Sequence, residues 1–280
     1  MKVYILTDLE GPDGVNGRSD GIGNQILNKD VAAEALTNEV NACCEGLVKA
    51  GADEIRVLDG HGGSATLNAL KLHPAAQLMQ VGRWAPTVAV DASFDAMVQL
   101  GAHGMQQSGG HMCHTFNSHG VQWMKLNGAF IGEIGVCSYL GAYFGVPTIL
   151  VSGDDTACAE AQALLGSEVE TVMTKHGVNR YTAVNRPPKE VYAEMTAKAE
   201  KALKALSTMK PLPMPEHLQL DVRVMCPNQT WGPEMLGIEL LDEVTMRYVS
   251  DDMVDLWSQR LGWAPGVHNR RFGITPQWRG

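Results

Sequence analysis

The sequence has little positive charge. Lysine and arginine together number 22, against 31 aspartate and glutamate residues among 280, which gives a formal net charge of −9 at pH 7. Nucleic acids and anionic membrane surfaces are bound through basic patches, so this deficit argues against both as partners. The only local basic run, Arg270-Arg271, is too short to alter that conclusion.

Long apolar runs and paired cysteines are also missing. No stretch reaches the roughly 20 apolar residues that span a bilayer, and the chain reaches Asp8 before any run typical of a signal peptide. The six cysteines form no C-x-x-C pair and are too few for a disulfide scaffold in a chain of this size. We therefore expect reduced thiols in a cytoplasmic protein.

The first half of the chain alternates strand and helix patterns. With 45% hydrophobic and 19% charged residues, the chain is typical of a folded globular protein. The alternation predicts an α/β fold, a mostly parallel sheet with helices on both faces. Strands are expected at 3–7, 55–58, 97–102 and 148–152, and helices at 30–50, 133–144 and 156–165.

The first predicted helix has the clearest signals. We expect Asp30 to cap it and Gly51 to end it, after a glycine-rich loop from Gly11 to about Lys29. Its apolar face is predicted to contain Leu36, Val40, Cys43, Leu47 and Val48.

The segment Asn185-Arg186-Pro187-Pro188 predicts a domain boundary. We expect a metal-binding catalytic α/β domain at 1–186 and a smaller α+β domain at 187–280, for oligomerisation and pocket shaping. The second range contains a helical stripe after the prolines, strand patterns at 218–225 and 244–249, and a last helix capped by Asp251 that ends near Leu261. Residues 264–280 lack periodicity and could form either an arm on a neighbouring subunit or a frayed tail.

Three predicted strands end in side chains that can bind metal. The first runs into Asp8-Leu9-Glu10-Gly11, the second into Asp59-Gly60-His61, and the third into Gly101-Ala102-His103. In open parallel sheets ligands bind outside the carboxyl ends of the strands, so these side chains are expected to converge. Imidazole and carboxylate are the ligands of hydrolytic zinc sites. Asp8 could bridge two metals while Glu10 holds one.

Further candidates follow along the chain. Glu133 is either another ligand or an acidic residue favoured by the helix dipole. His111, His114 and His119, with Cys113 among them, lie within nine residues, more than nine histidines in 280 would give by chance. A histidine beside a metal-bound water can act as a general acid or base.

Together these residues resemble the DppA-type D-aminopeptidases, zinc peptidases that release N-terminal D-amino acids from short peptides. The matching pieces recur in order over roughly 1–165: Asp8-Leu9-Glu10-Gly11, Asp59-Gly60-His61, Leu72-His73-Pro74, Gly101-Ala102-His103, His114, Gly132-Glu133-Ile134-Gly135 and Gly153-Asp154-Asp155.

The resemblance implies two zinc ions per subunit. Asp8 would bridge them, Glu10 and His61 would complete one site, and His103 and Glu133 the other. His114 would be the catalytic histidine. The resemblance also implies a ring-shaped homo-oligomer, a decamer, with active sites that face an internal space.

Three further residues are candidates for roles around the metal site. Asp59 either orients its loop or a ligating imidazole, or is a simple turn residue. Asn127 either contacts substrate or is an ordinary turn asparagine. Phe116 lies in the loop that carries His114, and we expect that loop to shape the substrate pocket.

A fold and a metal pair do not fix the substrate. The leading hypothesis is an aminopeptidase acting on short peptides with an N-terminal D-residue. The alternative is an amidase or cyclic-amide hydrolase with the same metal core and a small non-peptide amide. A phosphate-ester hydrolase and a non-catalytic metal-binding protein are further hypotheses, and manganese or cobalt would tolerate similar ligands.

Overall fold

A seven-stranded sheet forms the centre of the molecule. The computed structural model describes residues 1–80, 89–230 and 237–262. Neighbouring strands of the large sheet are parallel, except that β10 and β11 are antiparallel, which confirms the predicted mostly parallel sheet. In spatial order its strands are β11 (Thr182–Asn185), β10 (Glu170–Asn179), β9 (Thr148–Asp154), β6 (Ala96–Ala102), β1 (Lys2–Thr7), β4 (Glu54–Asp59) and β5 (Ala76–Gln80).

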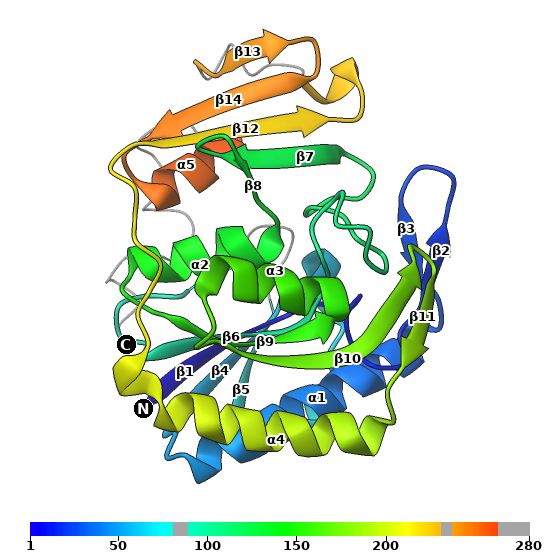
Figure 1. Cartoon of the computed structure of the whole chain (residues 1–280), viewed down its shortest axis with the longest axis vertical. Coiled ribbons are helices and arrows are strands. Elements are labelled where there is room, and N and C mark those ends of the chain that lie inside the picture. The colour runs from blue at the N-terminus through cyan, green and yellow to red at the C-terminus, as the bar shows by residue number, and fades with distance from the viewer. Residues whose placement is uncertain (81–88, 231–236, 263–280) are drawn as a thin grey trace.

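Helices cover both faces of this sheet, as predicted. On one face lie α1 (Lys29–Lys49) and α4 (Pro188–Lys204), and on the other lie α2 (Glu133–Tyr143) and α3 (Asp155–Leu165) (Figure 1). One apolar core joins β1, β4 and β6 to α1 and α4, and a smaller one joins β6 and β9 to α2 and α3. Burial of both faces explains why the central strands are continuous apolar runs.

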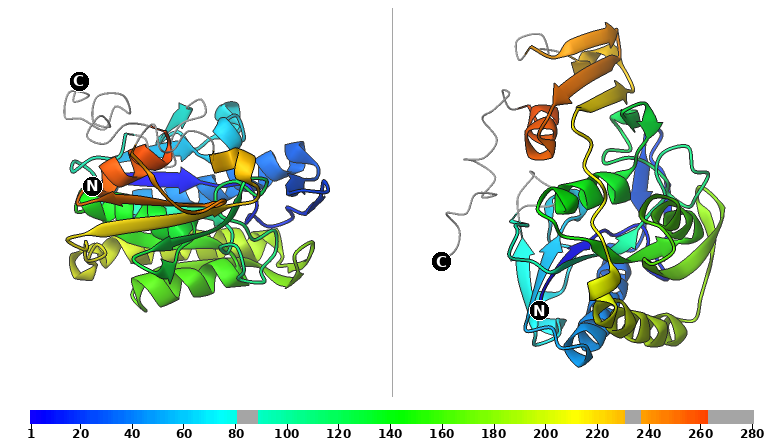
Figure 2. Two further views of the ribbon diagram at one scale, coloured as in Figure 1. Left: turned by 90° about the horizontal axis from the view of Figure 1, so that it is seen from above. Right: turned by 60° about the vertical axis from the view of Figure 1, so that its left-hand side comes forward.

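A second, antiparallel sheet lies above α2. Helix α5 (Met253–Arg260) packs between this sheet and α2, and Figure 2 shows the sheet at one end of the molecule. In spatial order its strands are β13 (Glu239–Asp242), β14 (Thr245–Ser250), β12 (Leu218–Val224), β7 (Val121–Leu126) and β8 (Ala129–Phe130).

The two predicted domains are interleaved by these contacts. Strands β7 and β8 come from the range 1–186, yet they complete the sheet that 218–250 forms. Helix α4 comes from the range 187–280, yet it packs against α1 and β10. The division at residue 186 stays a prediction, and the packing layers cross it in both directions.

Several strands and short helices were not predicted. A hairpin of β2 (Gly17–Ser19) and β3 (Asn24–Ile26) lies inside the segment that was expected to be a glycine-rich loop. Strands β5, β7, β8, β10, β11 and β13 were also missed. The short 3₁₀ helices are His61–Gly63, Ala69–Lys71, Leu206–Thr208 and Pro227–Thr230.

Helix starts differ from the expectation at two places. Helix α1 begins after Asn28, which has a left-handed backbone (φ 51°), and Asp30 lies inside the first turn rather than at the cap. Helix α5 is capped by Asp252, whose side chain accepts a hydrogen bond from the Asp255 N–H. The expected cap, Asp251, instead pairs with His217. Both errors are of one or two residues, because several adjacent polar residues can serve as caps.

The apolar face of α1 is as predicted except at Val48. Leu36, Val40, Cys43 and Leu47 are fully buried, but Val48 is 42% exposed. We expect Leu47→Ala to lower the free energy of unfolding by about 2–5 kcal/mol, because a buried leucine loses its contacts and leaves a cavity. Val48→Ala is the neighbouring control and should change it by less than about 0.5 kcal/mol. Denaturant unfolding measures both, and equal losses would contradict the assigned face.

Within the described residues, no helix combines the length and the apolar character required to cross a bilayer. The segment 264–280, for which an arm or a tail was expected, lies outside the described residues.

Candidate active site

The carboxyl ends of β1, β4 and β6 meet, as predicted. Two glycines permit this close approach. A Cβ on Gly11 would lie 2.0 Å from the Ala102 carbonyl oxygen, and Gly101 has φ +70° with space only for hydrogen beside the Asp8 carbonyl. Backbone hydrogen bonds from Asp8 N to Leu100 O and from Gly11 N to Gly101 O, both 2.8 Å, join the two segments. This packing places Asp8 beside His103.

The two carboxylate oxygens of Asp8 face two different histidines. Oδ1 lies 2.9 Å from His61 Nδ1, and Oδ2 lies 3.2 Å from His103 Nε2. The three side chains come from the ends of three adjacent strands, β1, β4 and β6. This is the arrangement that a carboxylate bridging two cations requires.

Two glutamates complete the cluster. Glu10 Oε2 lies 3.1 Å from His61 Nδ1, on the same side as Asp8 Oδ1. Glu133, the first residue of α2, places Oε1 3.1 Å from His103 Nε2. The same oxygen accepts a hydrogen bond from Phe116 N (2.6 Å), which ties the loop of His114 to the helix start.

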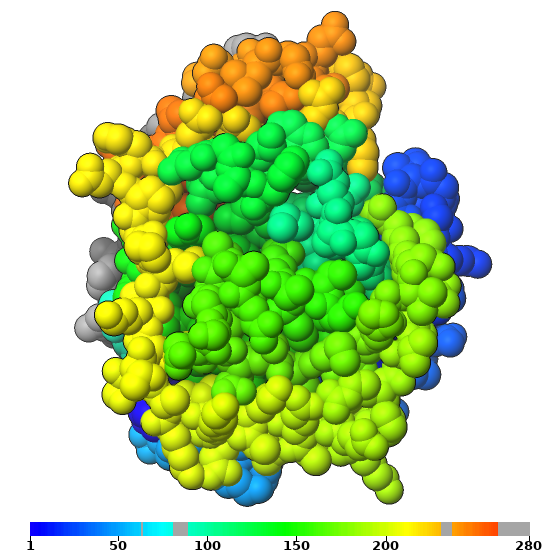
Figure 3. All heavy atoms as spheres, viewed as in Figure 1, coloured from blue at the N-terminus to red at the C-terminus, as the bar shows by residue number. Residues whose placement is uncertain are grey.

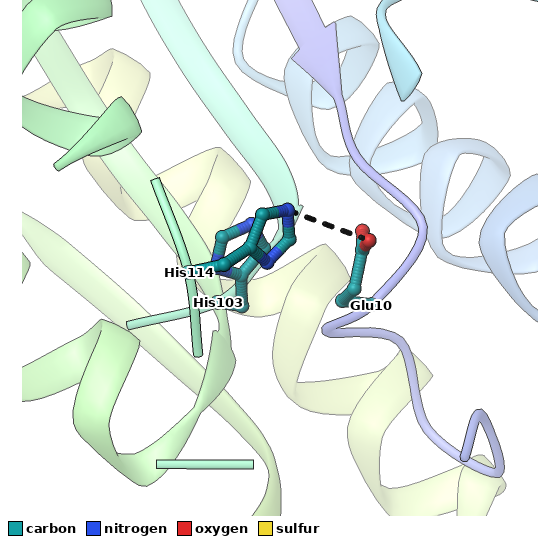
Figure 4. Close-up of side chains that lie close together, drawn as sticks. All are labelled: Glu10, His103 and His114. Carbon is teal, nitrogen blue, oxygen red and sulfur yellow. Dashed lines mark ion pairs between the residues drawn. The ribbon is translucent and has the colours of Figure 1, made fainter. Parts of the chain in front are cut away.

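His114 stacks on His103. Their ring centroids are 3.9 Å apart with an interplanar angle of 13°, and Figure 4 shows the two rings face to face with Glu10 opposite His114. His114 Nε2 lies 3.9 Å from Glu10 Oε1 and 3.7 Å from Glu133 Oε1. His114 Nε2 therefore faces both glutamate carboxylates, at distances longer than those of His61 and His103.

The donor atoms fit zinc. Three groups each bring ligand atoms within 4.8 Å of one another: Asp8, Glu10 and His61; Asp8, His103 and Glu133; Glu10, His103 and His114. Two of their buried atoms, Glu10 Oε2 and His103 Nε2, make no hydrogen bond. Buried polar atoms are nearly always satisfied, so these two point to a cation as their partner. The first two groups each offer three protein ligands, the number typical of catalytic zinc.

The electrostatics of the cluster support the same conclusion. Burial lowers the pKa of His61, but Glu10 and Asp8 outweigh burial and raise that pKa well above its usual value. Burial likewise lowers the pKa of His103, and Glu133 and Asp8 raise it overall. Burial raises the pKa of Asp8, yet the two histidines bring it well below normal. The carboxylates thus stabilise positive charge on the neighbouring histidines. Metal ions bound to the same side chains can supply that charge in place of protons.

Backbone carbonyls orient two of the imidazoles. His103 Nδ1 lies 3.0 Å from Gly104 O, and His114 Nδ1 lies 3.0 Å from Met112 O. In each ring Nδ1–H donates to the carbonyl, which leaves Nε2 as the nitrogen that faces the cluster.

Asp59 is fully buried and organises the loop that follows β4. It accepts hydrogen bonds from Thr66 N (2.8 Å) and Leu67 N (3.1 Å), as well as from the Thr66 hydroxyl. These contacts hold the loop that follows β4, and a role in orienting His61 stays a prediction.

Asn127 lies outside the cluster. It has φ 48° and precedes Gly128 in the β7–β8 turn, a pair typical of type I′ hairpins. Its amide is bonded to the backbone around β12: Nδ2 donates to His217 O and Oδ1 accepts from Gln219 N. It lines an apolar hollow of about 260 Å³ between the hairpin and α3, visible in Figure 3. This hollow shares no residue with the pocket lined by Asp8, His103 and Glu133. A substrate contact by Asn127 stays a prediction.

The other residues of the His114 loop have separate environments. The Phe116 ring packs on Trp257 of α5, with centroids 4.6 Å apart. His111 is buried, and its Nε2 lies 2.8 Å from Asn16 Oδ1. Cys113 is a buried free thiol. His119 pairs with Asp20 in the β2–β3 turn, 2.6 Å apart. His114 is thus the one histidine of the three that reaches the cluster.

A buried lysine was missed by the sequence analysis. Lys175 on β10 is fully buried, and its ammonium donates to Glu10 O and Val15 O, both at 2.7 Å. Glu39 of α1 accepts from Asp13 N (3.0 Å) in the same loop. These groups hold the segment that carries Asp8 and Glu10. A single lysine within a strand of mixed polar and apolar residues gives no pattern that sequence reasoning could use.

The buried Glu39 carboxyl is expected to make the free energy of unfolding depend on pH. Burial raises its pKa to about 7, while the Asp13 N–H and Lys175 oppose that shift. The folded state therefore keeps a proton that the unfolded state releases above about 4.5. This stability is complete below pH 4.5 and is lost as pH rises through about 7.

We expect Glu39→Gln to gain up to about 3 kcal/mol of unfolding free energy, relative to wild type, between pH 5 and pH 8. Denaturant unfolding across that range measures the difference. Glu34→Gln, at an exposed position of the same helix, is the control. If the unfolding free energy of Glu39→Gln depends on pH as steeply as that of wild type, Glu39 is not the group responsible for the pH dependence.

An α/β sheet whose strand ends gather imidazoles and carboxylates in this way is the scaffold of a metal-dependent hydrolase. The chain belongs to the Peptidase_M55 family, described as D-aminopeptidase, whose model matches residues 1–260. This membership confirms the predicted resemblance and the predicted class, a metal-dependent amide hydrolase of the aminopeptidase type.

A curated sequence and a solved structure match nearly the whole chain. The D-aminopeptidase of Bacillus subtilis (strain 168) is 28% identical over 265 residues, which are 93% of this chain and 96% of the relative. The solved structure of the Zn-dependent D-aminopeptidase DppA from Bacillus subtilis, described as a self-compartmentalizing protease, matches with a TM-score of 0.86 and 28% identity. That match covers 94% of this chain and 96% of DppA.

Proposed function

We propose that this protein is a dinuclear zinc aminopeptidase that releases N-terminal D-amino acids from short peptides. The observation that carries the proposal is Asp8, whose two oxygens face imidazoles on opposite sides. The similarity to a structure described as a Zn-dependent D-aminopeptidase supports both the metal and the substrate class.

In this proposal Asp8 would be shared by two zinc ions. Glu10 and His61 would complete one site, and His103 and Glu133 would complete the other. When bound, zinc polarises the scissile carbonyl and lowers the pKa of water in the site.

His114 is the proposed catalytic histidine. Burial and the neighbouring His103 lower its pKa, so the ring is neutral near pH 7 and its Nε2 accepts a proton. The Met112 carbonyl holds the opposite nitrogen. His114 then gives the proton to the leaving amine, the step that amide cleavage needs. Phe116 links this loop to α5 and, with it, is proposed to line the substrate pocket.

The proposal also covers the oligomeric state of the protein and its location in the cell. We expect a homo-oligomer, a decamer, since the similar structure is described as self-compartmentalizing. The six free cysteines support a reducing compartment such as the cytoplasm. Light scattering after size exclusion would give the number of subunits.

The deciding experiment compares D-alanyl and L-alanyl amides side by side. Zinc-loaded protein is assayed with each, next to a chelated sample, and zinc per subunit is measured by elemental analysis. Hydrolysis of the D-form alone, lost on chelation, with two zinc ions per subunit supports the proposal. Faster turnover of free amides or lactams than of D-peptides would favour the amidase alternative. Absence of any amide hydrolysis by metal-loaded protein would overturn both.

A further inference from the structure

His114 Nδ1, the ring nitrogen that faces away from the cluster, is held by the Met112 carbonyl, and Asn24 in turn holds that carbonyl. His114 Nδ1 lies 3.0 Å from Met112 O and 3.4 Å from Asn24 Nδ2. Asn24 Nδ2 also donates to Met112 O, at 2.6 Å. An amide NH₂ only donates, so of these two neighbours only the Met112 carbonyl can accept the imidazole N–H. Asn24 thus holds the Met112 carbonyl in place, and that carbonyl orients the His114 ring.

Met112 needs this support because its backbone is strained. It has φ 52°, a region that side-chain-bearing residues rarely adopt. Its N–H donates to Arg180 O (2.8 Å), and its carbonyl accepts from Asn24. Both polar groups of the Met112 backbone are therefore held by residues from outside the loop, which is how a strained conformation persists.

Tyr181 in turn orients the Asn24 amide. The Tyr181 hydroxyl donates to Asn24 Oδ1 at 3.0 Å, which directs Asn24 Nδ2 toward the Met112 carbonyl. Asn24 N donates to Ser118 Oγ, also at 3.0 Å, and anchors the strand. The hydrogen bonds form one series: Tyr181 donates to Asn24, and Asn24 donates to the Met112 carbonyl. The same carbonyl accepts the N–H of the His114 imidazole.

Three segments distant in sequence meet here. Asn24 begins β3, Tyr181 lies in the turn between β10 and β11, and His114 lies in the loop before β7. Figure 1 shows the β2–β3 and β10–β11 hairpins on the same side of the molecule, and Figure 3 shows their atoms beside this loop. Neither Asn24 nor Tyr181 belongs to the three ligand groups.

We propose that Asn24 and Tyr181 are positioning residues that act through His114, by holding its Nδ1 on the Met112 carbonyl and its Nε2 toward the cluster. The inference rests on the proposed function of His114 as proton carrier. It assigns the β2–β3 and β10–β11 hairpins a role in catalysis without any contact with zinc.

The test uses Asn24→Ala and the milder Tyr181→Phe, which removes a single hydroxyl. With D-alanyl amide and zinc-loaded protein, Asn24→Ala should lower kcat about 10- to 100-fold, the range typical of residues that orient catalytic groups. Tyr181→Phe should lower it about 3- to 10-fold, since the amide loses orientation but keeps its donor. KM and zinc content should stay within about twofold, because no ligand is altered. Tyr192→Phe, a tyrosine of α4 in the same core, is the control and should keep wild-type kcat.

Two comparisons separate positioning from general damage. In a His114→Ala background, neither variant should lower kcat further, because residues that act through one group are non-additive. A second readout needs no turnover: hydrogen–deuterium exchange at the Cε1–H of His114, followed by mass spectrometry. Exchange should accelerate in Asn24→Ala and Tyr181→Phe and stay at the wild-type rate in Tyr192→Phe.

The inference is overturned if Tyr181→Phe and Asn24→Ala keep wild-type kcat. It is also overturned if they lower kcat by the same factor in the His114→Ala background, or if the exchange rate of the His114 Cε1–H stays at the wild-type value. The proposed function can fail separately. If wild-type protein hydrolyses neither alanyl amide, that function is wrong, and the exchange rates still decide whether the two residues hold His114.

Discussion

His61→Ala is expected to abolish amide hydrolysis and to remove zinc from one of the two proposed sites. His61 supplies the imidazole that Asp8 Oδ1 and Glu10 Oε2 share, at 2.9 and 3.1 Å. Without it, one proposed site keeps two carboxylates and no nitrogen ligand, too few for catalytic zinc. Because the His61 side chain is 26% exposed, its loss should leave the fold intact. Elemental analysis of zinc and turnover of D-alanyl amide measure the two effects.

The control for His61→Ala is His217→Ala. His217 is an exposed histidine beside β12 whose only ion pair within the described residues is with Asp251. It should retain full zinc content and turnover. Wild-type zinc content and activity in His61→Ala would refute the metal assignment, whereas lost activity with unchanged zinc would leave His61 a role other than ligation.

Lys175→Met is expected to lower the free energy of unfolding by about 3–5 kcal/mol, the cost of removing one partner of a buried charged network. The Lys175 ammonium bonds two carbonyls of the Asp8 loop. Burial lowers its pKa to about 8, while Glu39 and Asp154 oppose that shift, so the group is charged at pH 7. Methionine fills the space but leaves both carbonyls and the buried carboxylates uncompensated.

Denaturant unfolding at pH 7 with chelator present measures this loss without a contribution from bound zinc. Protein concentration is held fixed, because assembly adds to the apparent stability of an oligomer. Lys201→Met is the control. Its ion pair with Glu170 is at the surface, where the lysine is 72% exposed, and such pairs contribute little. A change below about 1 kcal/mol in Lys175→Met would contradict the assigned role.

Side chains at strand ends could be predicted because strand direction determines where they go. Once β1, β4 and β6 are parallel neighbours, Asp8, His61 and His103 share one edge of the sheet whatever the details of packing. The same reasoning does not reach His114, which follows no strand. Its placement depended on the family resemblance, and only the stacking on His103 shows how it enters the site.

Helix bounds were predictable to within one or two residues, but the hairpins were not. Strands β2 and β3 have three residues each, too few to show an apolar alternation. Helix α4 was predicted from its apolar stripe, yet its partner α1 lies well over a hundred residues earlier in the chain. Periodicity reports that an element has a buried face and does not report what covers it.

The sequence by itself determined the α/β alternation and the types of ligand at each strand end, because these follow from local pattern and chain direction. Only the tertiary structure decided which groups support those ligands. Lys175 beneath Glu10, Glu39 beside Asp13, and the series from Tyr181 through Asn24 to Met112 all join residues more than 25 positions apart. Such contacts depend on the final packing of several elements at once, which no single stretch of sequence encodes.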